Sequence, residues 1–438
     1  MSLRETSRSF ATWSFAHGLQ RRALRSASRR GDLIARVTVD PVVAADPFPA
    51  YEELRRRGPL VTSPIAAATV DHAVAQEVLR SDAFGTAAGH AELPAPVRRL
   101  LERITDPWAA SPVDPPSMLV VDPPDHTRYR RLVSRAFTAR SVGGLQERVE
   151  AVAARLLDRI TGDAFDVVES YAALLPVTVI ADLLGVPEEE HGRLLEWGNR
   201  AAVTLDPGLT FRDYRAAEEA LRRMHHWFDA HVARLRRDPG DDLLSRLAVL
   251  QDDEALTAEE LRAVGLLVLG AGFETTVNLI GNAVVALDAH PDQLRLLRSE
   301  PDRWGNAVEE VLRHDSPVQL TMRSAYADVN LAAAGGAVVP SGQAVLVLLG
   351  GANRDPEVFA DPATFDVTRA NAGQHLAFSA GIHFCLGARL ARLEASTGLR
   401  ALYERFPGLT VTGPPTRRPT PVLRGFAHVP VSARRRVA

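Results

Sequence analysis

Lysine is absent from this chain of 438 residues, and cysteine occurs only once. Every basic side chain is therefore arginine or histidine, which excludes a Schiff-base lysine and the lysine of a phosphate-binding P-loop. A single cysteine excludes an intrachain disulfide framework and a four-cysteine zinc site. The formal net charge of -3 does not indicate a protein that binds nucleic acid or another polyanion.

Long hydrophobic runs are also missing. The longest lie near residues 263–273 and 344–352, well short of the roughly 20 residues of a membrane-spanning helix. The N-terminus lacks the apolar segment of a signal peptide. We therefore expect a cytoplasmic protein with no transmembrane segment.

Residues 1–37 form an unusual extension, because eight arginines are interleaved there with Phe10, Trp13 and Phe15. A loose or surface-packed extension is the simplest interpretation. A helix that makes peripheral contact with a membrane surface is one alternative, and a transit peptide is another.

Residues 38–438 are expected to form a single domain. The length would allow about three domains, but no low-complexity linker or internal repeat divides this part of the chain. Helical periodicity dominates, and the predicted helices are 145–160, 171–184, 188–205, 211–235, 258–289 and 388–403. Short strand signals lie at 60–62, 67–70, 324–339, 344–349 and 420–430. The expected fold class is mainly α with a minor β-sheet assembled from distant segments.

The longest predicted helix has clear ends. It begins with the capping box Thr257-Ala-Glu-Glu260, and His290-Pro291 ends it. It is longer than ordinary globular helices, so we expect it to cross the whole molecule.

The only thiol lies in the loop Phe378-Ser-Ala-Gly-Ile-His383-Phe-Cys385-Leu-Gly387, directly before a predicted helix. Unpaired N–H groups and the helix dipole at that position lower the pKa of a thiol and favour the thiolate. The glycines let backbone amides approach the sulfur. A nucleophile with His383 as its base and a ligand of haem iron beside Phe378 both remain open. The glycines and the helix argue against an inert, buried cysteine.

The string Ala271-Gly-Phe-Glu274-Thr275-Thr places polar groups in the middle of the long apolar helix. A buried carboxylate is costly unless it is paired, hydrated or used, and each of two glycines weakens the helix by about 1 kcal/mol relative to alanine. We expect a local distortion that holds a small ligand or water, with the Thr275 hydroxyl turned away from the backbone. A glycine kink that serves packing, together with a salt-bridged glutamate, is the alternative. A dinucleotide-binding turn is disfavoured, because no strand precedes the string.

Prolines set the start of a helix over residues 122–137. One face of this helix carries His126, Arg130, Val133 and Phe137, and the opposite face carries Arg128, Arg131 and Arg135. The inward histidine and arginine need an anion, whereas the outward triplet is either a solvated face or a docking patch. Elsewhere, Glu310 and Arg313 are three residues apart and can pair on one helical face.

Together these segments resemble the cytochrome P-450 superfamily of haem-thiolate monooxygenases, in its soluble bacterial form. The cysteine loop matches the signature Phe-x-x-Gly-x-His-x-Cys-x-Gly at every position. The mid-helix string matches the oxygen-activation motif, and Glu310-x-x-Arg313 matches a pair typical of the fold. Asn353-Arg-Asp-Pro356 is also similar, and the resemblance runs in order from about Asp40 to the C-terminus.

The resemblance implies haem b (iron protoporphyrin IX) as the cofactor, with Cys385 as the axial iron ligand. It implies that Glu274 and Thr275 deliver protons during oxygen activation. It also implies a set of haem-binding residues, namely His126, Arg130, Arg323 and His383 at the propionates, with Ala271, Phe378 and Gly387 beside the ring. Glu310 and Arg313 are structural in the family. Their usual arginine partner is missing from Pro362-Ala-Thr-Phe365, and Arg369 is the candidate to replace it.

The implied activity is hydroxylation or epoxidation of an organic substrate with one atom of dioxygen. In the family the pocket lies between the segments 84–117, 188–230, Leu267 with Ala271, 318–320 and the turn at Phe426. These segments are mostly apolar, which favours a lipid, terpenoid, steroid or polyketide-like substrate. A peroxide-using haem-thiolate enzyme is one alternative, and Glu274 with Thr275 argues against it. A non-catalytic haem or gas sensor is the other.

Electrons are expected from an acidic ferredoxin with its reductase. The chain leaves no room for a flavin or iron–sulfur domain, and one cysteine cannot hold a cluster. Arg128, Arg131 and Arg135 are the expected docking patch, because steering charges raise association rates.

Overall fold

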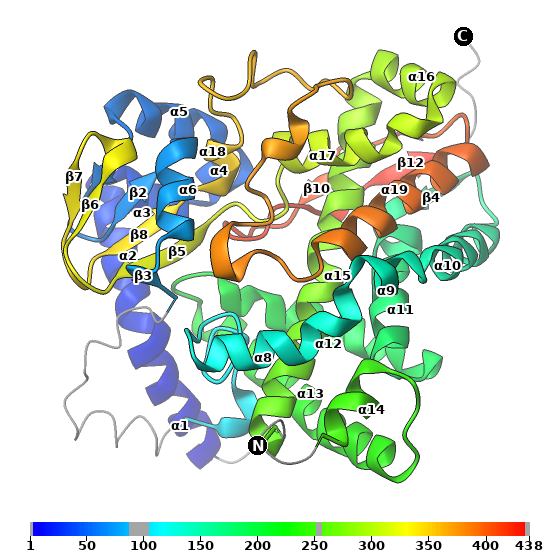
Figure 1. Cartoon of the computed structure of the whole chain (residues 1–438), viewed down its shortest axis with the longest axis horizontal. Helices are drawn as coiled ribbons and strands as arrows, with labels where there is room; N and C mark the ends of the chain where they lie inside the picture. Colours follow the sequence, from blue (N-terminus) through cyan, green and yellow to red (C-terminus); the bar gives the residue numbers. More distant parts are fainter. Residues whose placement is uncertain (1–2, 87–104, 251–255, 434–438) are drawn as a thin grey trace.

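Helices make up most of the molecule and surround one long central helix. The computed structural model describes residues 3–86, 105–250 and 256–433. Within these residues, α15 (Ala258–Ala289) runs through the middle of the molecule (Figure 1). The predicted fold class, mainly α with a minor β-sheet, is confirmed.

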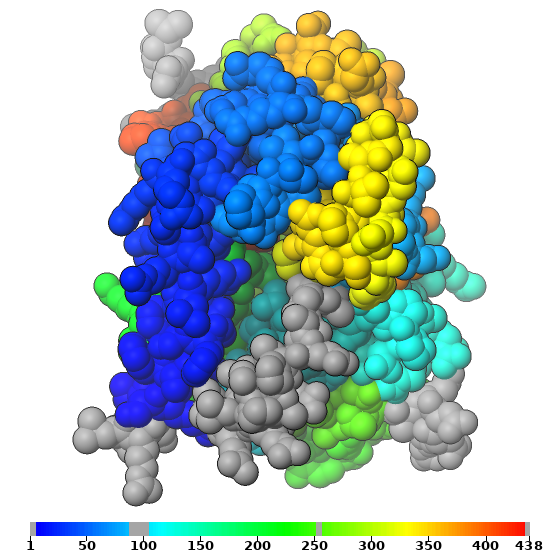
Figure 2. Space-filling view, turned by 90° about the vertical axis from the view of Figure 1, so that its left-hand side faces the viewer, coloured from blue at the N-terminus to red at the C-terminus, as the bar shows by residue number. Residues whose placement is uncertain are grey.

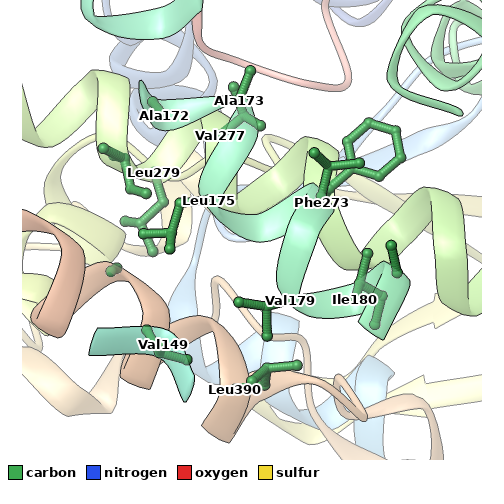
Figure 3. Packing of buried hydrophobic residues seen from close by; sticks show 14 of the residues in the cluster. Val149, Ala172, Ala173, Leu175, Val179, Ile180, Phe273, Val277, Leu279 and Leu390 are labelled. Carbon is green, nitrogen blue, oxygen red and sulfur yellow. The ribbon is translucent and has the colours of Figure 1, made fainter. Parts of the chain in front are cut away.

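The ends of α15 lie where the sequence predicts them. The Thr257 side chain accepts the backbone N–H of Glu260, the Glu260 carboxylate accepts the backbone N–H of Thr257, and the helix ends at His290. α15 is long and apolar enough to span a membrane, but most of it is buried inside the protein. Figure 3 shows the reason: Phe273 and Val277 of α15 lie in one packed cluster with Leu175 and Val179 of α11 and Leu390 of α19.

The other helices lie before and after α15 along the chain. Those before it are α1 (Leu3–Trp13), α2 (Leu19–Arg29), α3 (Leu33–Val39), α4 (Pro41–Ala45), α5 (Phe48–Arg57), α6 (His72–Arg80), α8 (Asp125–Ser134), α9 (Ala139–Gly143), α10 (Gln146–Asp158), α11 (Leu174–Leu183), α12 (His191–Ala202), α13 (Phe211–Arg237) and α14 (Leu243–Ala248). Those after it are α16 (Pro291–Ser299), α17 (Trp304–His314), α18 (Leu349–Ala352) and α19 (Ala388–Arg405).

Short 3-10 and π-helical turns join several of these helices. The π-helical turns are η1 (Ser14–Gly18) and η4 (Val168–Ala172), so the helix predicted from 171 begins in a π-turn. The 3-10 turns are η2 (Pro107–Ala109), η3 (Arg135–Phe137), η5 (Glu188–Glu190), η6 (Val203–Leu205), η8 (Pro301–Arg303), η9 (Ala332–Ala334), η10 (Ala372–Gln374) and η11 (Gly381–His383).

The main sheet joins residues 61–85 to residues 321–347 at one side of the molecule (Figure 1). Its strand order is β1 (Val61–Thr62), β2 (Ala67–Thr69), β8 (Ala344–Val347), β5 (Thr321–Ala325) and β3 (Phe84–Gly85). β2 and β8 are parallel, with Ala68 opposite Leu346, and the other pairs are antiparallel. The expectation of a small sheet built from distant segments therefore holds.

Two predicted hairpins are shifted. In the 324–339 region, β5 joins the main sheet, and only β6 (Val329–Leu331) and β7 (Ala337–Val339) form a hairpin. Near the C-terminus, β11 (Phe426–His428) pairs with β10 (Thr416–Arg417), which starts four residues before the predicted 420. β12 (Pro430–Ser432) joins β4 (Ala164–Asp166) and β9 (Thr410–Val411) in a separate sheet. These strands are too short to carry a periodic signal, so the sequence placed them poorly.

The N-terminal extension packs on the protein, and Figure 2 shows its helices along one side (blue). Trp13 Nε1 donates to the carbonyl of Leu209 at 2.9 Å, and Arg21 Nη1 donates to that of Gly208 at 2.9 Å. Ser9 Oγ lies 2.8 Å from the buried Glu218 carboxylate of α13. The extension is therefore packed on the surface of the protein, and the expectation that it is loose is wrong.

Candidate active site

The loop before α19 is built around glycine and the single thiol. Gly381 has φ +69°, and a Cβ there would lie 2.2 Å from the carbonyl oxygen of Leu79, so no other residue fits. The backbone N–H of Cys385 donates to the carbonyl of Phe378 at 2.9 Å, which closes the loop. α19 then begins at Ala388, as predicted.

The pKa of Cys385 is raised above its usual range, so the expected lowering is wrong for the protein alone. Burial is the largest cause and outweighs the amides of Gly387 and Ala388 and the charges of Arg130 and Arg392, which act in the other direction. A metal ion would reverse this balance, because a coordinating thiol is deprotonated outright.

The thiol loop and the centre of α15 both have open space beside them. Cys385 is exposed, although burial is the largest influence on its pKa. In α15, Ala271 is exposed and Thr275 half-buried, whereas most residues around them are buried. A Cβ added to Gly270 would meet nothing within 4 Å, and the same is true of Gly387.

Four basic side chains gather beside this loop, as the sequence predicts. The rings of His126 and His383 are 4.2 Å apart, Arg323 is buried, and Arg130 donates to the carbonyl of Phe384 at 2.6 Å. Nε2 of each histidine is buried without a hydrogen-bond partner, and His383 lies 3.7 Å from Asp122, too far for a hydrogen bond.

Burial and the neighbouring arginines keep both histidines neutral. Burial is the main reason why the pKa of His126 is lowered and that of His383 falls to about 4. Burial also lowers the pKa of Arg323 to about 10. Two orphaned imidazole nitrogens beside two arginines are the donor set that the two propionates of haem require, so these residues fit the cofactor.

Phe378 lies beside the thiol loop, as expected. Its ring packs against His375 and Phe384, and the Arg392 guanidinium lies over it at 4.5 Å from the ring centroid. The loop is thereby fixed to α19, which carries Arg392.

Glu274 is buried and has one charged partner. Arg418 Nη1 lies 2.7 Å from Glu274 Oε1, and Glu274 Oε2 has no hydrogen-bond partner. Burial raises the pKa of Glu274, and Arg418 opposes that rise. Arg418 was not predicted, because it is 144 residues away in the chain and nothing in its sequence context sets it apart.

The expected distortion of α15 is wrong. The helix is continuous, and the Thr275 hydroxyl donates to the carbonyl of Ala271 at 3.2 Å, four residues earlier. A Cβ on Gly272 would lie 2.6 Å from Ile180 of α11, so this glycine allows α11 to pack closely against α15 and does not serve to bend the helix. Of the alternative interpretation, the packing glycine and the salt-bridged glutamate are found, and the kink is not.

A second acid near the site was also missed. Glu394 of α19 is fully buried, and both of its carboxyl oxygens lack a geometric hydrogen-bond partner. Burial raises its pKa well above the usual range, although Thr276 of α15 opposes this, so the carboxyl is neutral. Its position one turn after Leu390, on the apolar face of α19, is the sequence signal that could have revealed it.

Of the three arginines predicted to point outward, two are exposed and Arg128 is half-buried. Arg128 forms an ion pair with Glu260 and lies 4.9 Å from the Tyr129 ring centroid, so its place in the patch was wrong. Glu260 belongs to the capping box of α15 and also accepts the Tyr129 hydroxyl at 2.8 Å. Arg131 and Arg135 are exposed.

Glu310 and Arg313 form a fully buried pair. Arg313 donates twice to Glu310, at 2.7 and 2.8 Å, and also to the carbonyls of Pro362 and Thr364. Arg369 Nε lies 3.2 Å from Glu310, so it takes the place of the missing arginine.

The expected pocket segments are only partly described. Residues 87–104 of the 84–117 segment lie outside the described residues. Val318 and Leu320 are half-buried, and Val318 pairs with Leu423 of the C-terminal loop. Phe426 is buried beneath Arg417, whose guanidinium is 4.1 Å from its ring centroid.

Comparisons with known proteins show which family this chain is similar to. A family model described as cytochrome P-450 matches residues 193–431. Cytochrome P-450 140 of Mycobacterium tuberculosis is 47% identical over 426 residues, 96% of each chain. The 6-deoxyerythronolide B hydroxylase of Saccharopolyspora erythraea is 44% identical over 317 residues, 71% of this chain and 76% of that protein. The ligand-free crystal structure of Mycobacterium smegmatis CYP164A2 superposes with a TM-score of 0.81 at 36% identity, over 91% of this chain and 99% of that one.

Proposed function

Because the chain belongs to the cytochrome P-450 family and is a haem-dependent monooxygenase, we propose that it hydroxylates or epoxidises an apolar small molecule. The observation that carries the substrate class is the apolar character of the residues around the centre of α15. Leu267, Ala271, Val318 and Leu320 offer no charge to a substrate, and Thr275 adds one hydroxyl. The similarity to 6-deoxyerythronolide B hydroxylase favours a polyketide-like molecule among the candidates.

The residues of the chain have distinct tasks in this proposal. When bound, haem would supply the iron that activates dioxygen, and the Cys385 thiolate would hold that iron. His126, Arg130, Arg323 and His383 would bind the propionates and thereby orient the cofactor. Glu274 exchanges protons with solvent and passes them towards the Thr275 hydroxyl, which presents them to the site.

Two measurements test the proposal. The reduced protein with carbon monoxide should give the thiolate-type absorption spectrum, and Cys385→Ala should abolish it. A library of lipids, terpenoids, steroids and polyketides, screened by the haem spin-state shift, should then yield apolar binders. Product formation with peroxide alone, and none with dioxygen and reductant, would favour the peroxide-using alternative. A thiolate spectrum without any turnover would favour the sensor.

Electrons are proposed to come from an acidic ferredoxin, which docks near α8. Arg131 and Arg135 supply exposed positive charge, and the bond from Arg130 to the Phe384 carbonyl holds α8 beside the thiol loop. The double variant Arg131→Glu/Arg135→Glu should slow reduction by ferredoxin, most strongly at low salt. Reduction by dithionite should be unchanged. Equal ferredoxin-driven rates across a salt series would remove this patch from the interface.

We further propose a cytoplasmic protein in which residues 1–37 and 38–438 are a packed arm and one haem domain, with one correction to that boundary. It falls inside α3 (Leu33–Val39), whose buried Leu33 and Ile34 belong to the core, so the arm ends before α3. The rings of Phe10 and Trp13 both contact Phe211 of α13, with centroids 5.3 and 5.5 Å apart, although Phe10 remains 52% exposed. These contacts favour an arm that packs on the protein. Deleting residues 1–31 should leave the carbon monoxide spectrum intact and lower the thermal stability. Sedimentation of the full chain with anionic vesicles, lost on this deletion, would support membrane contact instead.

A further inference from the structure

One face of α15 carries a polar stripe, although the helix is otherwise apolar. Glu274, Asn278 and Asn282 recur every four residues and therefore share this face. Asn282 Nδ2 donates to the carbonyls of Asp315 and Arg424 at 2.9 and 3.1 Å. The stripe is thus the surface on which the β10–β11 hairpin rests.

Glycine lets the hairpin approach closely. A Cβ on Gly425 would lie 2.0 Å from Asn278 Oδ1, so only glycine can occupy this position. Asn278 lies one helical turn after Glu274. The contact therefore fixes the position of the hairpin along the axis of α15. It places Arg418, the first residue after β10, beside Glu274.

The hairpin also holds Arg418 in place. Its backbone N–H donates to the carbonyl of Gly425 at 3.1 Å, and its Nε lies 3.4 Å from that of Phe426. The neighbouring Arg417 points elsewhere, to Asp315 at 2.9 Å. Two adjacent arginines therefore serve two different acids.

No second charged group competes for Glu274 among the contacts of the described residues. From α11 and α12, Ile180 and Gly198 pack against Gly272 and Phe273 of α15. From α19, Glu394 reaches Thr276. From the α12–α13 turn, Asp206 accepts the N–H of Val422 at 3.2 Å, and burial raises its pKa to about 7.

We propose that Arg418 is a positioning residue for the proton-delivery step: it binds one oxygen of Glu274 and fixes the direction of the carboxylate. The second oxygen is left free to take up and release a proton. This inference rests on the proposed function for its purpose, but the ionisation of Glu274 can be measured without turnover. Loss of Arg418 leaves burial unopposed, so Glu274 should become neutral at a higher pH than in the wild type.

The test is an infrared titration of the haem-loaded full chain. The bands of protonated carboxyl groups are assigned by their loss in Glu274→Gln, Glu394→Gln and Asp206→Asn. In Arg418→Gln the Glu274 band should persist to higher pH than in the wild type, and Arg418→Lys should return it part of the way. Arg417→Gln, the matched control, should leave it unmoved. The stretching band of carbon monoxide in the reduced protein should change with pH in parallel.

Defined results would overturn the proposal. These are an unmoved Glu274 band in Arg418→Gln, or an equal displacement in Arg417→Gln. If Arg418→Gln cannot be purified, Arg418→Lys alone must displace the band, and an unmoved band then counts against the proposal. Failure of the proposed function would look different, because the wild type itself would lack the thiolate carbon monoxide spectrum while the Glu274 titration stayed measurable.

Discussion

Two regions of this protein each bury a glutamate that pairs with arginine, but the two carboxylates accept very different numbers of hydrogen bonds. Glu310 accepts both Arg313 bonds, the Arg369 guanidinium and the Asp366 amide. Glu274 accepts one arginine bond and leaves an oxygen unpaired. A carboxylate with every lone pair engaged holds segments together, whereas one with a free oxygen can still exchange a proton. The number of donors therefore separates the structural acid from the reactive one.

Breaking the Glu310–Arg313 pair should have the largest effect on stability. Arg313→Ala leaves Glu310 charged and buried beside Arg369 alone, and it also frees the carbonyls of Pro362 and Thr364. We expect a loss of about 3–5 kcal/mol in the free energy of unfolding, measured by urea denaturation. The control is Arg400→Ala, which breaks an exposed pair with Glu404 and should cost less than about 1 kcal/mol. Similar losses in both variants would contradict the role of Glu310 as an anchor.

Glu274→Gln should show the opposite pattern. It keeps the shape of the side chain but leaves the Arg418 guanidinium, which is 18% exposed, without its charged partner, so the loss of stability should be smaller than in Arg313→Ala. Turnover should fall by roughly 100-fold, the usual contribution of a positioned acid or base. Rates of product formation under saturating electron supply measure this. Normal turnover would show that Glu274, like Glu310, only holds the fold together.

Thr275→Ala should have a smaller effect on the same step. Its hydroxyl bonds only to the Ala271 carbonyl, so its removal should leave α15 intact. Consumption of reducing equivalents should continue while less product and more peroxide form. The ratio of product to reducing equivalents is the measurement, and an unchanged ratio would assign Thr275 to packing.

Glu394 is a third buried acid, and its carboxyl oxygens have no hydrogen-bond partner by distance and angle. Its substitution should have the smallest effect of the series. Its pKa is raised well above normal by burial, so the folded chain holds a proton that the unfolded chain releases. Stability from this group is complete below the ordinary pKa of glutamate and is lost as the pH rises towards the folded value. Glu394→Gln should therefore stabilise the protein at pH 7 more than at pH 5, as measured by thermal unfolding. A constant difference between the two pH values would mean that Glu394 is ionised in the folded state.

The features that the sequence predicts correctly are local ones. The capping box, the apolar run and His290-Pro291 define α15 within a single stretch of chain, so its bounds agree residue for residue. The thiol loop is likewise contiguous. The partners of these elements come from far away in the chain: Arg128 meets Glu260, and Arg418 meets Glu274. No local pattern marks such pairs, since any surface helix carries similar arginines.

The error on Cys385 has the same origin. Helix dipole and amides can be inferred from the order of residues, but burial depends on the whole fold, and burial is the largest influence on this thiol. The two hairpins were misplaced for another reason, whereas the strands predicted at 60–62, 67–70 and 344–349 are found. Strands of two or three residues cannot show a period, and their pairing is decided by tertiary contacts.

The absence of lysine has a practical consequence for chemical labelling. No side chain of this protein carries a primary amine, so carbodiimide coupling cannot join it through lysine to the carboxylates of an acidic partner. The same fact makes Arg131→Lys or Arg135→Lys the sole side-chain amine in the molecule while preserving the charge. An amine-reactive fluorophore or cross-linker would then attach to only one side chain, on the exposed face of α8, with the N-terminal amine as the other reactive group.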